Sequence, residues 1–566
     1  MSARQAAGAE PPRALFYILV AEFDIDKGST LKHSYPGKIE GYDDSQLAEW
    51  MLPEGAHKRE DDWTYFFLNR GALSPDSGAR KEGHHATTDK VFLRCINNVH
   101  NVRDKSARRG AKVTALSLCS PYNFLNKLKP AALLGLDAYI ENPSVEVLKK
   151  IYDAINKCID MAAIPRLSTF EKMLMYADDD DNKRYHIFSV QWPALGKKSA
   201  FDIPLHIPLF VQKEMIGDVN SLIPFLRAFG GVNTMVIFSA VLLEKRVMFV
   251  GSPEIEAGTV CEMVLAAANM LSPPFPLLPA RTFPYANLND LGFLDVPGYI
   301  AGVTNPLFKI KSEWWDILCD VETGMVWDES MLGEKQQPNS MAQKLMKAAT
   351  FADDGIIQGL LANEADLQFI QKVISGVDQH LGEQFVHDEF TKYSRNIMQL
   401  MASFKSSGRK AGGDGPIESL MAASTQNSIR ARLAEFEKTR MYQHAKTREA
   451  KTPGCAIGID IRKSIRALKG SKKIEESELA RMLGEILLVL QEKDDFVNFL
   501  YFMDNDVNAL GICLFHKSGD VRALSCQILE RLREWPCSEC AMKRMNGFYK
   551  HAFDQRKAGK GAGQLR

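Results

Sequence analysis

The chain has 566 residues, of which 45% are hydrophobic and 25% are charged. This composition is that of an ordinary globular protein and excludes disordered and fibrous classes, and the length predicts about three domains. Lysine plus arginine equals aspartate plus glutamate at 70 each, so the formal net charge is zero and no global field attracts the chain to nucleic acid or to an anionic membrane. Any such contact must be local.

No segment has the signature of a membrane span or a secretory signal. The apolar run at 14–23 is too short to cross a bilayer, and no other run reaches the required length of about 18 uncharged apolar residues. Most of the ten cysteines lie inside apolar runs, which is typical of reduced, buried thiols. We therefore expect a cytoplasmic protein with no transmembrane segment.

The first 160 residues alternate strand-like and helix-like segments. Two apolar runs flank the tetrapeptide Ile-Asp-Lys-Gly at 25–28, which predicts an opening β-hairpin. Three further strands are expected at 61–70, 90–100 and 111–121, and a pair of helices follows them. An antiparallel sheet with helices packed on it is an α+β module.

A second module, of α/β type, is expected from residue 201. Residues 163–200 before it resemble a connector, and its run of four aspartates lacks the ligand spacing of a calcium loop. In the second module a helix leads into "RVMFVG" at 246–251, which is typical of a strand buried on both faces. A long apolar helix at 258–271 comes next.

The stretch "PGYIAGVTNPLF" at 297–308 is rich in small residues. Its glycines allow either approach to a phosphate or close packing of a strand, and packing is favoured because no basic residue occurs before Lys309. The following "SEWWDIL" has the pattern of a helix start, with Ser312 as N-cap. On a helix, the two adjacent tryptophans would point about 100° apart, one to the core and one outward.

From about residue 340 onward every periodic segment predicts a helix. Two helices are expected to be separated near Gly382, and the last 110 residues resemble successive amphipathic helices compatible with a helical-repeat array.

No catalytic motif is present. The chain contains no phosphate-cradling G-x-x-x-x-G-K-[ST] loop, nucleophile elbow, zinc-protease motif or kinase catalytic loop. The pair His84-His85 falls in an expected surface loop, and the lone Cys537-Cys540 pair lacks the second half of a zinc site. We expect no cofactor, no metal and no nucleic-acid partner.

Four stretches carry a resemblance to a known family. They are "FYILVAEFDIDKGSTLKHSYP", "AKVTALSLCSPYNF", "FGGVNTMVIFSAVLLEKRVMFVG" and "FPYANLNDLGFLDVPGYIAGVTNPLFKIKSEWWDILCD". Together they resemble DENN-domain proteins, especially the branch related to the fungal MesA-like, Arf-docking polarity proteins. The resemblance covers much of residues 14–330 and continues into the helices at 350–402.

The resemblance implies a multidomain protein of α+β and α/β lobes with an all-helical, armadillo-like C-terminal region. The implied segments are a disordered N-terminus (1–13), a longin-like uDENN lobe (14–162), the connector (163–200), a central cDENN lobe (201–335), a helical dDENN-like part (340–405), a linker with a charged helix (406–454), a C-terminal helical array (455–552) and a disordered tail (553–566).

The function that this resemblance implies is regulation of small GTPases in membrane traffic or cell polarity. Most characterised DENN proteins are guanine-nucleotide exchange factors for Rab GTPases, and the polarity branch is linked to Arf docking. An exchange factor binds the nucleotide-free GTPase better than the loaded one, so it needs a shaped surface and no nucleophile or metal. Such a protein would be recruited peripherally to vesicle membranes or the cell cortex.

Two patches are the expected GTPase interface. The first is a basic hairpin tip, whose guanidinium groups would pair with carboxylates; its residues are Arg103, Asp104, Lys105, Arg108 and Arg109. The second is a set of aromatic and amide anchors, for which core packing is the alternative interpretation; its residues are Tyr299, Asn305 and the exposed member of Trp314 and Trp315.

Other functions remain open on the same fold. One is a non-catalytic docking scaffold for a GTP-loaded Arf or Rab that displays the C-terminal helices to other trafficking proteins. Another is a longin-DENN GTPase-activating protein that supplies an arginine finger from Arg103, Arg108 or Arg109. The helices at 455–545 are also candidates for an autoinhibitory contact.

Overall fold

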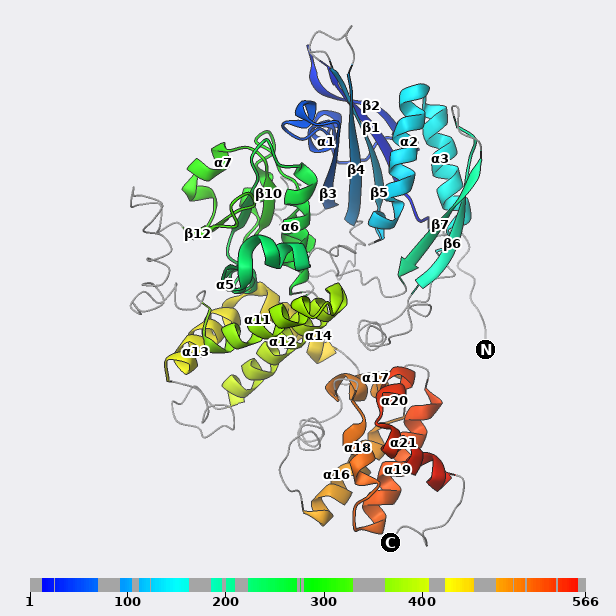
Figure 1. Cartoon of the computed structure of the whole chain (residues 1–566), viewed down its shortest axis with the longest axis vertical. Coiled ribbons are helices and arrows are strands. Elements are labelled where there is room, and N and C mark those ends of the chain that lie inside the picture. The colour runs from blue at the N-terminus through cyan, green and yellow to red at the C-terminus, as the bar shows by residue number, and fades with distance from the viewer. Residues whose placement is uncertain are drawn as a thin grey trace, which may run out of the picture. The chain divides into compact units, whose positions relative to one another are not determined.

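The structure, a computed structural model, describes most of the chain. The described residues are 13–24, 26–69, 92–103, 111–122, 124–161, 185–195, 200–208, 222–271, 275, 279–328, 362–406, 423–451, 475–491, 493–503, 506–535 and 538–557. The chain divides into two compact units (Figure 1). The larger unit comprises Met1–Ala162, Phe188–Leu205 and Lys213–Ala445, and the smaller unit comprises Ala163–Ile187, His206–Gln212 and Lys446–Arg566.

The first lobe of the larger unit, residues 13–161, is built on a five-stranded antiparallel sheet in the order β2-β1-β5-β4-β3. Its strands are β1 (Tyr17–Asp24), β2 (Gly28–Tyr35), β3 (Asp61–Asn69), β4 (Phe92–Arg103) and β5 (Ala111–Ser120). The expected opening hairpin is confirmed, because Asp24 pairs with Gly28. Gly28 has a φ of 75°, a value that glycine adopts without steric cost.

Helices cover both faces of this sheet. Helix α1 (Asp44–Met51) packs on one face, and α2 (Lys129–Glu141) and α3 (Val145–Cys158) pack on the other (Figure 1). The short 3-10 helices η1 (Ala56–Lys58) and η2 (Leu125–Leu128) connect these elements. Because both faces are covered, Ile18, Leu19, Val20 and Ala21 of β1 are all buried, which explains the continuous apolar run in the sequence.

The central lobe, residues 222–328, contains a second five-stranded sheet in the order β12-β11-β8-β10-β9. Its strands are β8 (Val247–Val250), β9 (Thr282–Phe283), β10 (Ile300–Val303), β11 (Ile317–Asp320) and β12 (Val326–Asp328). Strand β8 is parallel to both β10 and β11, and β12 is antiparallel to β11. All four residues of β8 are buried, which confirms the expectation of a strand covered on both faces.

Helices α5 (Leu222–Leu242) and α6 (Ala257–Asn269) cover one face of the central sheet. The other face carries α7 (Leu307–Ile310), the 3-10 helices η5 (Gly292–Asp295) and η6 (Ser312–Trp314), and an aromatic cluster. The 3-10 helix η4 (Pro279–Arg281) leads into β9. Within the described parts of the chain, α5 is the one helix long and apolar enough to cross a bilayer, but 61% of its most apolar 18-residue window is buried in the fold.

The strand β6 (Tyr185–Trp192) lies inside residues 163–200, which were predicted to be a connector. It pairs with β7 (Phe201–Pro208) in a two-stranded sheet. Phe188, Val190 and Trp192 are buried while the residues between them are exposed, so β6 has the period-two pattern of a strand with one covered face.

The remainder of the larger unit is helical. Helices α11 (Glu364–Asp378) and α12 (Gly382–Ser406) both pack on α5, and α13 (Ala423–Lys438) and α14 (Arg440–Lys451) follow. The expected break near Gly382 is confirmed, since this glycine has a φ of 81° at the start of α12.

The smaller unit has an all-helical core over the described residues 475–491, 493–503, 506–535 and 538–557. Its helices are α16 (Glu476–Val489), α17 (Lys493–Phe502), α18 (Asn508–Cys513), α19 (Gly519–Glu534), α20 (Glu539–Arg544) and α21 (Gly547–Lys557). They bury one apolar cluster, in which Leu483, Leu500 and Leu529 are fully covered. The expected helical C-terminal region is therefore confirmed.

Candidate functional site

The aromatic anchors expected at the surface divide into buried and half-buried groups. Tyr299 and Trp315 have no exposed surface and pack in the aromatic cluster of the central lobe. The Tyr299 hydroxyl donates to the carbonyl oxygen of Trp314, and the Trp315 indole N–H donates to the carbonyl oxygen of Phe308 at 3.1 Å. Burial raises the pKa of the Tyr299 hydroxyl. These two residues pack in the core and do not lie on the surface, where a docking anchor would be.

The expectation of a helix at "SEWWDIL" is wrong. Residues 312–314 form the single 3-10 turn η6, and Ile317–Asp320 is the strand β11. The backbone at Trp315 is already extended, with φ −141° and ψ 154°. Trp315 is buried in the aromatic cluster of the central lobe, and Trp314 packs against that cluster from its edge. Trp314 is half-buried and packs on Phe308, with ring centroids 5.3 Å apart. The strand forms because four successive residues can be buried beside β8.

Asn305 links the two lobes of the larger unit. Its side-chain NH₂ group donates to the Glu54 carboxylate at 2.8 Å, and its side-chain oxygen Oδ1 accepts from the backbone N–H of Leu307 at 2.9 Å. Of the second expected patch, Asn305 and Trp314 therefore keep access to the surface, and Asn305 contacts the first lobe.

The first expected patch lies almost wholly outside the described residues. Arg103 is the last residue of β4, and its backbone pairs with Ala111 of β5. Asp104, Lys105, Arg108 and Arg109 fall outside the described part of the chain, as do His84-His85, the four aspartates at 178–181 and Cys537.

The small residues of "PGYIAG" serve close packing. A Cβ atom on Gly302 would lie 2.4 Å from the carbonyl oxygen of Pro284, and one on Gly298 would lie 2.6 Å from that of Glu244. Lys309, the nearest cation in sequence, is paired with Asp320 at 2.6 Å. The geometry therefore supports the packing interpretation and not a phosphate site.

Replacing Gly302 with alanine should destabilise the central lobe by about 1–3 kcal/mol, because the new methyl group forces β10 away from Pro284. A urea titration of the full chain followed by tryptophan emission measures the effect. The matched control is Gly37→Ala, where a Cβ meets nothing within 4 Å, and its effect should stay within about 0.5 kcal/mol. Equal stability of the two variants would contradict the packing argument.

The junction between the two lobes is built around Asp62 at the start of β3. Strand β3 is an edge of the first sheet, and helix α6 of the central lobe covers it. The buried Asp62 carboxylate accepts the backbone N–H groups of Ala257 and Gly258 at 3.1 and 3.2 Å, so it caps the N-terminus of α6 from the other lobe. The two lobes are thus joined by a helix cap made across 195 residues of sequence.

Arg59 completes this junction. Its guanidinium lies 2.8 Å from the Asp62 carboxylate and donates to the carbonyl oxygens of Pro253 and Ile255 at 3.1 and 2.6 Å. A Cβ on Gly258 would lie 2.9 Å from the Trp63 carbonyl oxygen, so α6 approaches β3 as closely as a glycine allows.

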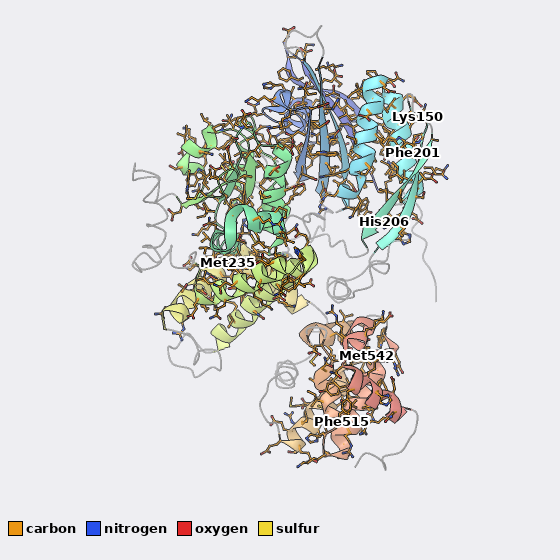
Figure 2. All side chains as sticks on the ribbon, in the orientation of Figure 1. Lys150, Phe201, His206, Met235, Phe515 and Met542 are labelled. Atoms are coloured by element: carbon orange, nitrogen blue, oxygen red, sulfur yellow. The ribbon has the colours of Figure 1, made fainter. Side chains whose placement is uncertain are left out.

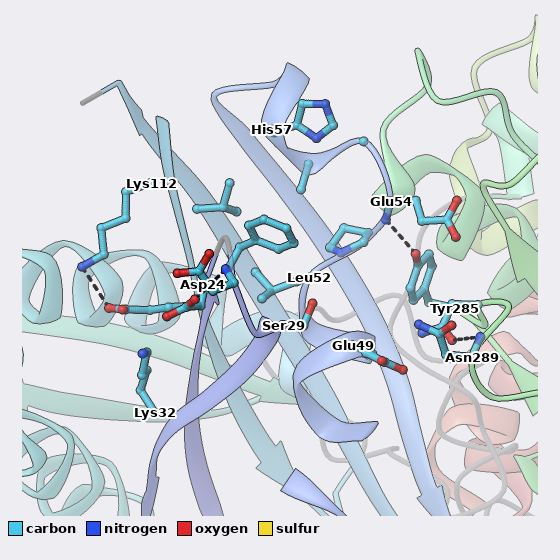
Figure 3. Close-up of a pocket in the computed structure, with 18 residues that line it drawn as sticks. Asp24, Ser29, Lys32, Glu49, Leu52, Glu54, His57, Lys112, Tyr285 and Asn289 are labelled. Atoms are coloured by element: carbon cyan, nitrogen blue, oxygen red, sulfur yellow. Dashed lines mark hydrogen bonds and ion pairs between the residues drawn. The ribbon is translucent and has the colours of Figure 1, made fainter. Parts of the chain in front are cut away.

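A groove of about 710 Å³ opens beside this junction (Figure 3). We name it the lobe-junction groove. The β1–β2 hairpin, the α1–η1 segment, the start of β5 and one loop of the central lobe line it, with the residues Glu22, Phe23, Asp24, Asp26, Ser29, Lys32, Glu49, Leu52, Pro53, Glu54, Gly55, Ala56, His57, Lys112, Val113, Tyr285, Asn287 and Asn289.

Hydrogen bonds fix the central-lobe wall of the groove to the first lobe. The backbone N–H of Glu54 donates to the Tyr285 hydroxyl at 3.0 Å (Figure 3). Gln46 on α1 donates to Asp290 at 3.1 Å. Together with the Asn305–Glu54 bond, these contacts hold the groove in one shape, which favours recognition of a partner without a large ordering cost.

The groove is acidic. Its lining includes five carboxylates, those of Glu22, Asp24, Asp26, Glu49 and Glu54, against the two lysines Lys32 and Lys112. Lys112 is already paired with Glu22 at 3.1 Å. The chain as a whole is neutral, so this local excess of negative charge is the electrostatic feature that a basic partner would meet.

The Glu49 carboxylate is partly withdrawn from solvent. Burial raises its pKa, a hydrogen bond from Asn289 opposes the rise, and the negative charge of Asp290 adds to it. Backbone N–H groups of Asp26 and Lys27 lower the pKa of Asp24, so that carboxylate is satisfied within its own turn. A cation beside Glu49 would favour the ionised form of this carboxylate and so oppose the rise in its pKa.

None of the residues that line the groove was predicted from the sequence to be a site residue. They come from segments up to 267 positions apart, from Glu22 to Asn289. Those at 22–32, 112–113 and 285–289 lie in stretches that carry the family resemblance, but none belongs to a motif with a known chemical role. The acidic residues of "AEFDID" at 21–26 are the one local signal, since they interrupt an apolar strand at a turn.

Comparisons with protein families match two separate segments. Residues 17–112 match the family described as the docking domain of Afi1 for Arf3 in vesicle trafficking. Residues 219–330 match the family described as stabilization of polarity axis. The first match spans β1 to the beginning of β5, and the second spans α5 to β12, so both matched segments line the groove.

Two curated proteins are similar over longer stretches. An AFI1-like protein of Schizosaccharomyces pombe is 25% identical over 372 residues, covering 56% of this chain and 59% of that protein. ARF3-interacting protein 1 of Saccharomyces cerevisiae is 20% identical over 529 residues, covering 68% of this chain and 57% of that protein. The matches thus span less than two thirds of either relative. In its first and central lobes, the chain is similar to an Arf3-docking domain and to a polarity-axis family respectively.

Proposed function

We propose that this chain is a docking protein for an Arf-class small GTPase in vesicle traffic and cell polarity, and that the lobe-junction groove is part of its docking surface. The observation that carries the proposal is the position of the groove. Its acidic walls come from the segment similar to an Arf3-docking domain, and its remaining wall comes from the segment similar to a polarity-axis family.

The descriptions of both families concern docking and polarity, and neither mentions nucleotide exchange. The docking interpretation therefore has more direct support than exchange on a Rab GTPase, the main implication of the DENN resemblance. A docking protein recognises one nucleotide state and leaves the rates of nucleotide release and hydrolysis unchanged.

Docking, nucleotide exchange and GTPase activation can be told apart by one set of measurements with the full chain. Affinity is measured for an Arf-class GTPase loaded with GDP, loaded with a non-hydrolysable GTP analogue, and free of nucleotide, and GDP release and GTP hydrolysis are followed alongside. Docking predicts tightest binding to the GTP form with both rates unchanged. Faster GDP release with preference for the nucleotide-free form would replace docking by exchange. Faster hydrolysis that is lost in Arg103→Ala would replace it by activation, and no binding in any state would refute all three.

Reversing charge in the groove should weaken GTPase binding. For the double variant Asp26→Lys and Glu49→Lys we expect Kd to rise at least about tenfold, or about 1.4 kcal/mol, because two attractive carboxylates become repulsive. Titration calorimetry with the GTP-loaded GTPase measures Kd. The control is Asp153→Lys, an exposed carboxylate on α3 that does not line the groove, which makes the same charge change per residue and should leave Kd unchanged.

The same contact has a pH signature. The ionised form of Glu49 attracts a cation and the protonated form does not, and its pKa is raised. Affinity should therefore fall as the pH is lowered through that raised pKa, and Glu49→Gln should flatten the dependence. A Kd that rises with pH, or a pH profile that is identical in the variant, would exclude Glu49 from the interface.

A further inference from the structure

The smaller unit carries an exposed apolar patch formed by α18 and α21. Phe548 is 65% exposed, Ile512 is 58% exposed and Phe515 is 42% exposed. Figure 2 labels Phe515 in the smaller unit. Its ring stacks on that of Phe548 with the centroids 4.8 Å apart, and the Tyr549 ring lies 6.1 Å from each. We name Ile512, Phe515, Phe548 and Tyr549 the aromatic patch.

The patch rests on a fixed support. A Cβ on Gly511 would lie 2.7 Å from the side chain of Tyr549, so the two helices touch through this glycine. The backbone N–H of Asn546 donates to Asn508 at 2.8 Å, and Arg556 donates to the Leu514 carbonyl oxygen at 3.0 Å. The exposure of the two phenyl rings is therefore a property of the packed helices, and two stacked rings held in water favour a partner that removes them from it.

The two segments that form the patch carry charged side chains of one sign. The segments that form it, 507–519 and 540–553, contain no aspartate or glutamate. They contain Lys517, Lys543, Arg544 and Lys550 together with His516 and His551. Four acidic residues flank these segments. Glu539 pairs with Lys543 at 3.3 Å and Asp554 pairs with Arg533 at 2.7 Å, while Asp506 accepts from Asn508 at 2.9 Å and Asp520 lies in the first turn of α19.

We propose that the aromatic patch and its lysines bind the surface of an anionic lipid bilayer. Exposed phenylalanine beside lysine is the composition of peripheral membrane sites, where the ring enters the headgroup boundary and the ammonium groups meet anionic lipids. A protein partner is less well matched, because lysine is depleted from protein interfaces and the patch has only four apolar residues. Although the chain as a whole is neutral, the lysines beside the aromatic patch can be attracted to the anionic lipids of a membrane.

The test uses the full chain and sedimentation with vesicles of phosphatidylcholine, with and without phosphatidylserine. No GTPase is present, so the outcome is independent of the docking proposal. We expect binding to vesicles that contain phosphatidylserine, weakened by added salt, and little binding to phosphatidylcholine alone. A wild-type chain that stays in solution with both vesicles, or that binds both equally, would overturn the proposal.

Two variants separate the apolar and electrostatic contributions. Phe548→Ser should lower the vesicle affinity at least about tenfold, because the ring can no longer leave water. Lys517→Glu with Lys550→Glu should lower it and weaken its salt dependence. The matched control is Leu488→Ser on α16, whose side chain is 75% exposed outside the patch and which should bind as wild type does. Circular dichroism checks that each variant keeps its helices, and unchanged affinity in folded Phe548→Ser would refute the site.

Discussion

Replacing Asp366 with alanine should destabilise the α11–α13 helices by about 3–5 kcal/mol, because the change leaves a buried guanidinium without its partner. Asp366 is fully buried, and Arg432 on α13 donates to its two carboxylate oxygens at 2.9 and 2.6 Å. The Tyr393 hydroxyl on α12 donates to the same carboxylate. Burial alone would lower the pKa of Arg432, but the hydrogen bonds and charge of Asp366 outweigh it and raise that pKa, so the guanidinium stays charged.

Asp366 also starts its own helix. Its carboxylate accepts the backbone N–H of Asn363 at 3.0 Å, while the Asn363 side chain accepts the N–H of Asp366 at 3.0 Å. This capping box adds to the loss in the variant. Hydrogen exchange of peptides from α11 to α13, measured on the full chain across a urea series, reports the local stability.

Two further variants test whether the unpaired charge causes this loss of stability. Glu364→Ala removes an exposed carboxylate from the first turn of the same helix and should cost less than about 1 kcal/mol. The double variant Asp366→Leu and Arg432→Met should lose less stability than Asp366→Ala, because it removes both charges together. A double variant that is as unstable as the single one would show that the unpaired charge is not the main cost.

Replacing Asp62 with alanine should loosen the junction of the two lobes, at a cost of about 3 kcal/mol. The variant loses the cap of α6 and leaves the Arg59 guanidinium without its carboxylate. Hydrogen exchange of a peptide spanning 253–262 should speed up most, because the Ala257 and Gly258 amides lose their acceptor. Since both lobes line the lobe-junction groove, the proposed GTPase docking should weaken as well.

The neighbouring residue provides the control for this variant. Asp61 is exposed and pairs with His100 at 2.6 Å, so Asp61→Ala should cost less than about 1 kcal/mol and leave the α6 amides protected. Equal exchange of the 253–262 peptide in the two variants would contradict the cross-lobe cap.

Local patterns were sufficient for most elements of the fold. The hairpin at 17–35 was predictable because a glycine and an aspartate meet at its turn, and β8 because four apolar residues stand between polar ones. The break before α12 followed from Gly382. Strand β6 could have been found as well, since Phe188, Val190 and Trp192 alternate with less apolar residues.

The segment with the two tryptophans is one where the local pattern predicted the wrong secondary structure. In "SEWWDIL" a serine followed by glutamate indicates a helix start, but the four residues of β11, Ile317–Asp320, gain more by burial beside β8 than a short helix offers. Whether Trp314 or Trp315 faces the core depends on that choice. The orientation of both rings is therefore a consequence of packing on a strand that lies about 70 residues earlier.

The candidate site required the folded chain for a similar reason. Composition and charge excluded a global attraction to membranes or nucleic acid, and the resemblance of four stretches indicated a GTPase-related protein. The groove itself depends on Glu54 meeting Asn305 and Tyr285, and on Asp62 meeting the start of α6, which are contacts between residues about 200 or more positions apart. No local period or motif predicts which residues pair across the lobe junction. Such a hydrogen bond depends on the relative position of two elements, and tertiary packing sets that position.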